Sequence, residues 1–322
     1  MSESQSAMPK SMEASFDPGL TQKYTGVLKR IINKDGQFNV HRSGGTWRDS
    51  NPYTFLINTS WPMFLLIVTV AFIILNVIFA WLYVEVGASH IKGTEASTRG
   101  LQFLNVFFFS NHTLTTVGYG NMYPEGPLAN AVASIEALVG LMTFAIATGL
   151  VFGRFSRPSA RFGFSETMAI APYQSGTSLQ FRVVNRRANN LIEVEARMML
   201  MTVELANGRT ERKYYLLDLE RSQVLFLPLT WTVVHSIDEK SPLRGKGPRE
   251  LERLQAEVLV MMRGFDETFG QVVYARNSYR YDEIVWGAKF AAAFDVDAAG
   301  DLLLWVDRVG LTEAAPLPET AT

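Results

Sequence analysis

Residues 102–120 read QFLNVFFFSNHTLTTVGYG and combine a short apolar segment with a pentapeptide that contains two glycines. The apolar segment, residues 102–114, is too short to cross the roughly 30 Å hydrocarbon core of a bilayer as a helix. The pentapeptide TVGYG occupies residues 116–120, and its glycines permit backbone torsions that residues with a Cβ avoid. Irregular backbone at membrane depth is tolerated only where protein or water surrounds it. The stretch therefore predicts a re-entrant helix followed by a loop, if membrane-spanning helices flank it.

Two long apolar segments supply those flanks. Residues 62–86 are interrupted only by Thr69, Asn76 and Glu85, and residues 128–155 carry Glu136 as the only charge before their last two residues. At about 1.5 Å of rise per residue, both segments are long enough to span a bilayer with some tilt. Both are therefore predicted to be transmembrane helices, the outer and the inner helix of a pore domain at residues 61–158.

The positive charges predict the orientation of these helices. Basic residues precede the first span (Lys23, Lys29, Arg30, Lys34, Arg42 and Arg48) and lie at or beyond the end of the second (Arg154, Arg157 and Arg161). The connecting segment, residues 87–127, contains only Lys92 and Arg99. Because cytoplasmic loops carry the excess of Lys and Arg, both termini are predicted to be cytoplasmic and TVGYG to lie on the outer side.

Composition agrees with a membrane part joined to a soluble part. Apolar residues make up 48% of the 322-residue chain and charged residues only 19%. The formal net charge of -1 gives no global field that would attract nucleic acid, so no nucleic-acid partner is expected. Cysteine is absent, which excludes a disulfide framework. The first residues lack a charged segment followed by an apolar one, and no cleavable signal peptide is expected.

The N-terminal segment, residues 1–46, is expected to be cytoplasmic and partly disordered. Residues 1–20 are rich in Ser, Met, Pro and Glu without periodicity, whereas residues 37–41 are compatible with a short strand. Residues 47–60 mix aromatic and polar side chains just before the first span. They predict an amphipathic helix in the membrane interface, anchored by Trp47, Tyr53 and Trp61, with a plain linker as the alternative.

Beyond residue 158 the pattern changes to that of an all-β sandwich, predicted for residues 159–312. Apolar and polar residues alternate along residues 179–183 and 192–198, and Asn207-Gly208 is a typical hairpin turn. Further short apolar runs follow at residues 224–229, 232–237, 259–262 and 272–275, and residues 248–255 predict a short helix. The Ala-, Pro- and Thr-rich tail, residues 313–322, is predicted to be disordered.

TVGYG is the pentapeptide from which potassium channels build their selectivity filter. Four such loops around one axis surround a dehydrated K⁺ with rings of backbone carbonyls, so a chain with one loop must act as a tetramer. The C-terminus of the preceding helix directs partial negative charge toward the ion. The predicted K⁺ ligands are Thr116, Val117, Gly118, Tyr119 and Gly120, with K⁺ as the permeant ion and no cofactor.

Several further stretches carry a wider resemblance. They are TGLVFGRFSRP (148–158), FRVVNRR (181–187), VHSIDEKSPL (234–243), GFDETFG (264–270), ARNSY (275–279) and EIVW (283–286). With two spans, one filter and a β-rich C-terminal half, the chain resembles the inward-rectifier potassium channel family, in particular its prokaryotic branch. The resemblance extends over roughly residues 47–306. It implies a multi-pass protein of the bacterial inner membrane.

The resemblance also implies an architecture and two constrictions. Family members are homotetramers with an interfacial slide helix and an immunoglobulin-like cytoplasmic domain that extends the pore. Phe152 would form the gate where the inner helices converge, and Gly149 could let the helix bend; the alternatives are a lipid-facing or packing aromatic and a close helix contact. Gly264, Gly270 and Gln271 would belong to a second, cytoplasmic constriction, a stretch that is otherwise an ordinary turn between strands.

The same resemblance suggests a lipid contact. Arg154, Arg157 and Arg161 follow the inner helix, where family members bind phosphoinositide or other anionic lipids. A simple positive-inside signal accounts for the three arginines almost as well.

Three positions depart from the family pattern. His112 stands where relatives carry a glutamate that supports the filter; it is either a neutral filler or the partner of Glu136 in a pH-sensitive pair. Asn121 replaces an aspartate beyond the filter, which lowers the negative charge at the outer mouth. Phe144 occupies the cavity position at which strong rectifiers carry an acid. Weak rectification is therefore predicted, unless Glu136, about 80° around the helix, faces the cavity.

Other functions find less support in the sequence. The four histidines are scattered and no nucleophile motif is present, so no enzymatic activity is expected. A channel gated through a dinucleotide-binding domain would require a G-x-G-x-x-G turn, which residues 159–322 lack. A membrane-anchored β-sandwich sensor with a non-conducting pore is the remaining alternative, although both filter glycines are intact.

Overall fold

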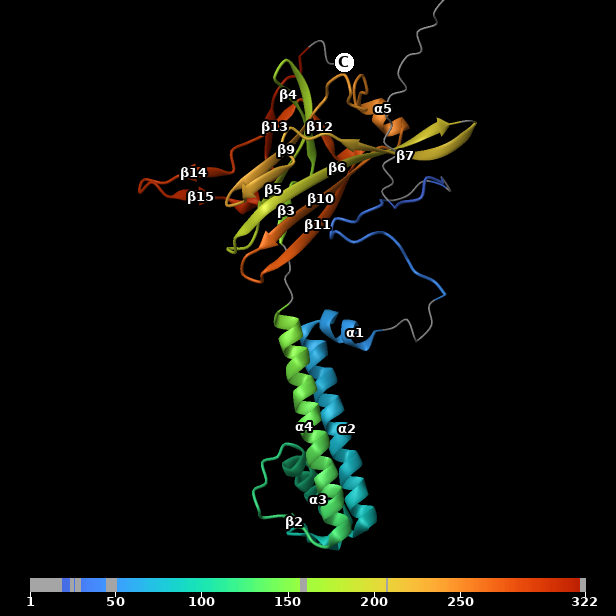
Figure 1. The fold of residues 1–322 in the computed structure, drawn as a ribbon, viewed down its shortest axis with the longest axis vertical. Coiled ribbons are helices and arrows are strands. Elements are labelled where there is room, and N and C mark those ends of the chain that lie inside the picture. The colour runs from blue at the N-terminus through green and yellow to red at the C-terminus, as the bar shows by residue number, and fades with distance from the viewer. Residues whose placement is uncertain are drawn as a thin grey trace, which may run out of the picture. The chain divides into compact units, whose positions relative to one another are not determined.

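The computed structural model describes residues 19–23, 26, 30–44, 51–156, 161–206 and 208–318. The chain divides into two compact units (Figure 1). The membrane unit comprises Arg42–Arg157, and the β unit combines Met1–His41 with Pro158–Thr322. In the described part of the chain, Trp61–His90 and Pro127–Phe155 are long and apolar enough to cross a membrane.

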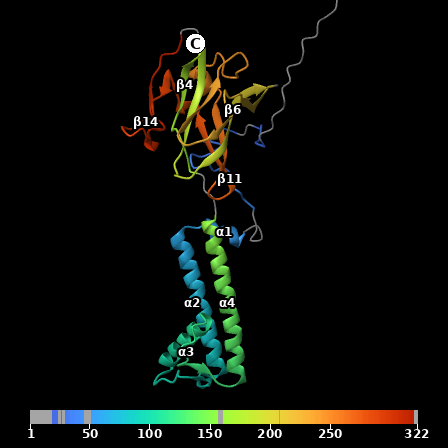
Figure 2. The same cartoon turned by 60° about the vertical axis from the view of Figure 1, so that its left-hand side comes forward.

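The membrane unit is built from four helices among its described residues. They are α1 (Pro52–Asn58), α2 (Trp61–Gly87), α3 (Arg99–Leu114) and α4 (Pro127–Phe155). Figures 1 and 2 show α2 and α4 side by side, with the short α3 packed against them near one end and α1 at the other. A short helical turn (Ala88–His90) and a two-stranded sheet of β1 (Ile91–Lys92) and β2 (Tyr123–Pro124) border the segment around α3.

Local sequence explains where the helices begin. The Asn51 side chain accepts hydrogen bonds from the backbone N–H groups of Tyr53 and Thr54, and Pro52 occupies the first turn. The described interfacial helix therefore begins at Pro52 and is shorter than residues 47–60; residues 47–50 lie outside the described residues. Thr98 caps α3 in the same way, so α3 begins three residues before the predicted position 102.

The core of the membrane unit lies where α2, α3 and α4 meet. It consists of Phe79, Ala80, Tyr83, Ile91, Val106, Phe109, Leu114 and Ala129, all buried. Much of the remaining apolar surface of α2 and α4 is exposed in the single chain, including Leu65, Ile74, Leu138 and Met142. Such faces are available to lipid or to further copies of the chain.

The β unit is a sandwich, as predicted. Among the described residues, one five-stranded sheet has the order β11-β10-β6-β7 with β8 also paired to β6, and the other has the order β12-β4-β5-β3 with β9 paired to β5. The strands of the first sheet are β6 (Leu191–Ala206), β7 (Arg209–Leu217), β8 (Gln223–Phe226), β10 (Glu257–Asp266) and β11 (Gln271–Arg280). Those of the second are β3 (Phe162–Phe164), β4 (Met168–Tyr173), β5 (Gly176–Asn185), β9 (Thr230–Ser236) and β12 (Ile284–Trp286).

Apolar side chains from both sheets fill the space between the layers. Phe181, Met198, Leu200, Val260 and Met262 are buried there. Because successive side chains of a strand point to opposite faces of its sheet, the alternating apolar residues of β5 and β6 point into the space between the two sheets. The predicted short helix is α5 (Pro248–Arg253), and β6 pairs with β7 across the predicted turn.

The C-terminal tail is ordered further than the sequence suggested. Glu313 belongs to β16 (Thr312–Ala314), which pairs with β13 (Ala288–Phe290). The Ala315 N–H donates to the Gly287 carbonyl at 2.8 Å, and the Ala315 side chain is buried. Disorder from residue 313 is therefore wrong for residues 313–318, because composition alone does not reveal a strand partner. Small edge pairs complete the unit, including β14 (Phe294–Val296) with β15 (Leu302–Leu304).

The N-terminal segment packs onto the β unit. Ile31 and Ile32 are buried against Met201 and Leu259, on the outer side of the first sheet. The strand expected at residues 37–41 is reduced to an isolated bridge between Ile32 and Phe38.

His235 on β9 is predicted to make stability depend on pH. Its Nδ1–H donates to the Asp218 carbonyl at 2.6 Å, and its Nε2 lies 2.8 Å from the Ser241 hydroxyl. Burial lowers the pKa of His235, so the folded protein favours the neutral ring. Its stabilising contribution is present above the unfolded pKa of about 6.5 and is lost as the pH falls below it.

The melting temperature of the detergent-solubilised protein should therefore be a few degrees lower at about pH 5.5 than at about pH 7.5. In His235→Gln, which cannot titrate, this difference should shrink. An equal pH dependence in both proteins would exclude His235 as its source.

Candidate functional site

The TVGYG loop leaves the C-terminus of α3 in a left-handed conformation. Thr116, Gly118 and Gly120 have φ values of 60°, 57° and 82°. Glycine adopts such torsions without a steric penalty, which explains the two glycines of the motif. The N–H groups of Val117 and Gly118 both point to the His112 carbonyl, at 3.0 and 3.3 Å. The last turn of the helix thus sets the direction in which the loop starts.

Two threonine hydroxyls donate to backbone carbonyls near the C-terminus of α3. The Thr113 hydroxyl donates to the Phe109 carbonyl at 2.9 Å, and the Thr115 hydroxyl donates to the Asn111 carbonyl at 2.6 Å. A helix C-terminus carries partial negative charge, which favours a cation at this position. In the single chain Val117 is 53% and Tyr119 72% exposed, so one copy leaves the loop largely uncovered.

A buried polar network lies behind the loop. Glu136 of α4 is fully buried and accepts hydrogen bonds from the Tyr83 hydroxyl of α2 and the Ser110 hydroxyl of α3, both at 2.5 Å. The Ser110 hydroxyl also lies 3.3 Å from the Asn76 carbonyl and side-chain oxygens. Because a buried carboxylate is costly unless hydrogen-bonded, these contacts hold the three helices in one arrangement.

Of the two alternatives for His112, the contacts within the chain argue against a pair with Glu136. The partners of Glu136 are Tyr83 and Ser110, whereas the His112 ring packs edge-on against Tyr119 with centroids 4.8 Å apart. His112 lies about 200° around the helix from Ser110, so it faces away from α4 when Ser110 faces it. Within the chain, His112 packs against Tyr119, and Glu136 joins α4 to α2 and α3.

The candidate gate and cavity residues project from α4. Phe144 is 72% and Phe152 70% exposed, so neither ring packs within its own chain. An added Cβ at Gly149 would meet no described atom within 4 Å, so this glycine is not explained by a close contact in the single chain. Weak rectification was predicted unless Glu136 faces the cavity. The Glu136 side chain is instead hydrogen-bonded to α2 and α3, so this exception does not apply.

The three predicted lipid-contact arginines differ in their surroundings. The guanidinium of Arg154 donates to the backbone carbonyls of Leu56, Ile57 and Thr59. It is therefore engaged by protein and not free to gather headgroups, which corrects the prediction for this residue. Arg157 lies outside the described residues. Arg161 is exposed and belongs to the β unit, not to the membrane unit.

The predicted cytoplasmic constriction needs a correction at Gly264. This residue lies within β10, beside a register shift, and an added Cβ would stand 3.2 Å from the Val194 side chain. The tip of the hairpin is the loop between β10 and β11, where Gly270 has a φ of 61°. Gly264 is thus explained by a β-bulge and close packing, whereas Gly270 lies in the loop and Gln271 follows it as the first residue of β11.

Asp266 organises this loop, although no pattern in the sequence marks it for that role. Asp266 is fully buried, and its Oδ1 accepts hydrogen bonds from the N–H groups of Thr268 and Phe269 at 2.9 and 3.4 Å. Its Oδ2 accepts a hydrogen bond from the Asn189 amide at 2.7 Å. The carboxylate thereby fixes the loop to the neighbouring strand connection.

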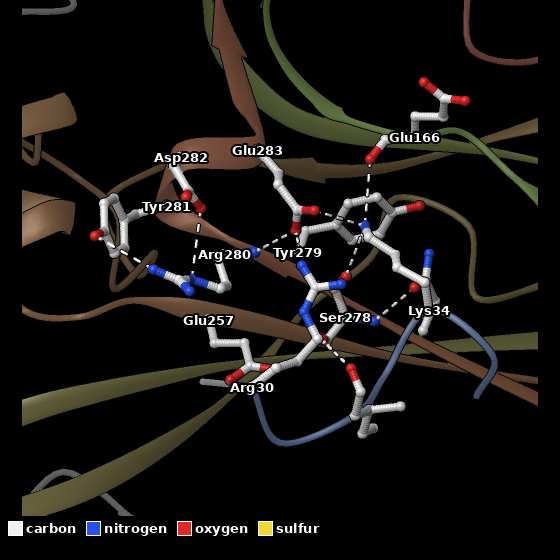
Figure 3. A network of polar contacts seen from close by, with 12 residues as sticks. Arg30, Lys34, Glu166, Glu257, Ser278, Tyr279, Arg280, Tyr281, Asp282 and Glu283 are labelled. Atoms are coloured by element: carbon white, nitrogen blue, oxygen red, sulfur yellow. Dashed lines mark hydrogen bonds and ion pairs between the residues drawn. The ribbon is translucent and has the colours of Figure 1, made fainter. Parts of the chain in front are cut away.

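A second polar network attaches the N-terminal segment to the β unit (Figure 3). Arg30 forms an ion pair with Glu283, and Lys34 Nζ lies 3.1 Å from the second oxygen of the same carboxylate. The Ile31 N–H points to the Glu257 carboxylate at 2.9 Å. Two cations sharing one carboxylate form a network of charge-assisted bonds, which are the stronger class of hydrogen bond.

Glu283→Gln is predicted to loosen the N-terminal segment. Burial alone would raise the pKa of Glu283, but hydrogen bonds from Arg30 and the Arg280 N–H, together with the charge of Lys34, hold it below its ordinary value. The carboxylate therefore stabilises the fold above the unfolded pKa of about 4.3, and this contribution is lost as the pH falls through the lower folded value.

At neutral pH, Glu283→Gln should increase amide hydrogen exchange at residues 30–36. Glu239→Gln, a change at a glutamate whose side chain is 88% exposed, serves as the matched control and should leave this exchange unchanged. Equal exchange in all three proteins would show that the carboxylate does not hold the segment.

Comparison with known proteins covers both units. A family model described as the inward rectifier potassium channel C-terminal domain matches residues 162–320, and one described as ion channel matches residues 56–157. The chain is 36% identical over 269 residues to the inward rectifier potassium channel Kirbac3.1 of Paramagnetospirillum magnetotacticum, covering 82% of this chain and 89% of the relative.

Animal proteins match over a similar extent. ATP-sensitive inward rectifier potassium channel 12 of Mus musculus is 28% identical over 300 residues, covering 85% of this chain and 70% of the relative. Inward rectifier potassium channel 4 of Homo sapiens is 28% identical over 302 residues, covering 81% and 67%. On these matches, which extend from the membrane helices through the β-sandwich, the chain belongs to the inward rectifier potassium channel family.

Proposed function

We propose that four copies of the chain form a potassium-selective membrane channel in which K⁺ passes through the TVGYG loops. The observation that carries this proposal is the loop itself, which has left-handed Gly118 and Gly120 and follows a short helix packed between two apolar helices. Four such loops supply rings of carbonyl oxygens that replace the hydration shell of the ion. The exposed Val117 and Tyr119 of the single chain are then covered by neighbouring copies.

The names of the relatives support the same function. The bacterial relative and both animal relatives are potassium channels of the inward-rectifier type. We extend the proposal to a bacterial inner membrane with both termini in the cytoplasm, because Lys and Arg are concentrated outside the segment that connects α2 and α4.

The gate is proposed at the cytoplasmic end of α4. Four exposed Phe152 side chains at a helix crossing form an apolar ring that closes by dewetting, and Gly149 leaves room for the helix to bend. A second constriction is proposed at the β10–β11 loops, which contain Gly270 and are followed by Gln271. Anionic lipid, such as phosphoinositide, is proposed to contact the basic residues that follow the inner helix in the sequence, Arg157 and Arg161.

Rectification is predicted to be weak because the cavity lacks an acid. Phe144 is exposed at the cavity position, and Glu136 is buried behind the filter. Mg²⁺ or polyamines therefore find no carboxylate that attracts them into the pore. Millimolar spermine on the cytoplasmic side should reduce outward current only slightly, and Phe144→Asp should make the block strong. Strong block of the unchanged protein would contradict the assignment of the cavity face.

Flux into liposomes tests the proposal as a whole. Liposomes loaded with K⁺ and containing the reconstituted protein are expected to take up ⁸⁶Rb⁺, driven by the outward K⁺ gradient. Gly118→Ala should lose this uptake because alanine is strained at a φ of 57°. Gly245→Ala, at a left-handed turn of the β unit with open space around it, is the control for general backbone strain. Uptake no greater than in protein-free liposomes, with and without anionic lipid, would overturn the proposal.

A further inference from the structure

The segment that connects α2 to α3, residues 88–98, is tied to the backbone that follows the filter. Within it β1 pairs antiparallel with β2, so that Ile91 lies opposite Pro124 and Lys92 lies opposite Tyr123. β2 lies at the same end of the membrane unit as α3 (Figure 1). The pairing therefore joins the α2–α3 connection to the residues that leave the TVGYG loop.

Gly93 follows β1 and lies directly against the backbone of Asn121. It has a φ of 83°, and an added Cβ would stand 2.2 Å from the Asn121 carbonyl oxygen and 3.2 Å from its carbonyl carbon. These are backbone atoms, so no flexible side chain can move aside. A Cβ at Gly118 or Gly120, in contrast, would meet no described atom within 4 Å. Close backbone contact with the rest of the chain thus resumes directly after the filter, at Asn121.

The α2–α3 connection is itself fixed to the core of the membrane unit. Ile91 is buried in this core, and Met122 packs against it from the other side of the pairing. Thr94 is fully buried, and its hydroxyl donates to the Ile91 carbonyl at 2.6 Å. The Asn105 side chain of α3 donates to the Thr94 carbonyl at 3.3 Å. The helix that leads into the filter therefore holds the segment that contacts the residues beyond it.

Two polar contacts lie beside the strand pairing. The Glu125 N–H donates to the His90 carbonyl at 2.7 Å. Lys92 Nζ lies 3.1 Å from Glu125 Oε2, and these side chains are 40% and 61% exposed. An exposed ion pair contributes little to stability by itself. It joins the same two segments as the backbone contacts, however, and its charges can be exchanged without a steric clash.

We propose that residues 91–94 form a clamp that fixes the far end of the TVGYG loop, with Gly93 as its positioning residue. The start of the loop is fixed at the His112 carbonyl, and the clamp fixes its end through Asn121. Rings of carbonyls replace the hydration shell of K⁺ only while each loop keeps its position. The inference rests on the proposed channel function for its effect on K⁺, whereas the clamp is a feature of the single chain.

Gly93→Ala is expected to shorten single-channel openings by about fivefold or more, because overpacking against the Asn121 backbone displaces the end of the filter. Raising K⁺ on the outer side should lengthen the openings again, since bound K⁺ stabilises the filter conformation that binds it. Poor assembly alone would give fewer channels with unchanged open times. Gly100→Ala, in the first turn of α3 with open space around it, is the matched control and should behave as the unchanged protein.

Gly93→Asn separates the close contact from backbone strain. Asparagine tolerates a left-handed φ better than alanine but has the same Cβ, so it should shorten openings at least as much. Recovery of the open time in this variant would show that strain at the φ of 83°, and not contact with Asn121, causes the effect of alanine.

Exchange of the ion pair tests the clamp even if the Gly93 variants do not assemble. Lys92→Glu and Glu125→Lys each place like charges together, so both should shorten openings by about two- to fivefold, and the double variant should restore them. The two single changes alter the charge at the outer mouth with opposite sign. An effect of the electric field on local K⁺ would therefore move the two variants in opposite directions.

Amide hydrogen exchange tests the clamp without any current. Exchange at residues 121–125 of the solubilised protein in K⁺ should rise in Gly93→Ala and in both single charge reversals, but not in Gly100→Ala or the double reversal. These changes in a protein without K⁺ flux would refute the channel and support the clamp. The clamp is overturned if Gly93→Ala and Gly100→Ala exchange alike, if Gly93→Asn restores the open time, or if the two charge reversals act in opposite directions.

Discussion

Gly140→Ala is expected to abolish most ⁸⁶Rb⁺ uptake and to destabilise the assembled protein. A Cβ at position 140 would stand 2.0 Å from the Leu114 carbonyl oxygen and 2.8 Å from its carbonyl carbon. Leu114 is the last residue of α3, directly before the filter loop. Backbone on both sides leaves no flexible side chain to move aside, so α4 and α3 must separate. Overpacking costs about 1–3 kcal/mol in each subunit, and here it displaces the support of the filter.

Gly149→Ala is the matched control for the predicted loss of stability; because Gly149 belongs to the proposed gate, uptake by this variant is not part of the control. It makes the same substitution in the same helix, but its Cβ meets no described atom within 4 Å. Alanine favours helix by about 1 kcal/mol over glycine, so the control should be at least as thermally stable as the unchanged protein. Uptake and melting temperature should be measured together. If Gly140→Ala retains both, α3 and α4 do not pack as described.

Glu136→Ala is expected to have the second large effect. The carboxyl group of Glu136 accepts hydrogen bonds from the hydroxyls of Tyr83 and Ser110. Alanine removes this acceptor, so both buried hydroxyls lose their hydrogen bond to it. Each buried hydroxyl that is left without a hydrogen-bond partner costs about 1–3 kcal/mol. Since the network joins α2, α3 and α4 behind the filter, the loss should appear first as unstable conduction: shorter openings and uptake reduced by about tenfold or more.

Glu136→Gln provides the graded comparison. The amide oxygen can accept one of the two hydroxyl hydrogen bonds, and its NH₂ group can donate to the other hydroxyl oxygen. Glutamine should therefore retain more conduction than alanine at the same expression level. Single-channel open times in the two variants are the measurement. Alanine and glutamine variants with unchanged open times would show that the network does not support the filter.

The sequence was sufficient for the features that local pattern and composition determine. The almost wholly apolar composition of residues 62–86 and 128–155 was sufficient to predict the two long helices, and the alternation along β5 and β6 was sufficient to predict the β-sandwich. The need for glycine at positions 118 and 120 also followed from backbone sterics alone, and both have positive φ values. These predictions depend on few neighbours, which explains their success.

The errors concern contacts between distant segments. Arg154 has the sequence context of a lipid-binding arginine, and nothing in its own segment reveals that α1 ends beside it. Gly264 belongs to a stretch that the family resemblance assigns to a constriction, but its register shift against β6 places it inside the sheet. The pair of His112 and Glu136, one of two alternatives that the sequence left open, is not formed, because the rotation of α3 turns the two side chains apart.

One missed network had a visible trace in the sequence. Asn76 and Glu136 are polar residues within otherwise apolar helices, and such residues mark partners inside a bundle. Ser110 of the short helix contacts both residues, but the sequence did not indicate that the face of this helix that carries Ser110 would point toward them. Asp266 and Glu283 could not be recognised in this way. Aspartate and glutamate are common on the surface of a β domain, so the sequence does not distinguish those that are enclosed by other residues.

K⁺ selectivity is tested directly by the reversal potential of the reconstituted protein, with K⁺ on one side of a planar bilayer and Na⁺ on the other. A filter formed by four TVGYG loops predicts a reversal potential close to that of a purely K⁺-selective membrane, and its loss in Gly118→Ala. A reversal potential near zero in the unchanged protein, with current carried equally by Na⁺ and K⁺, would contradict the account.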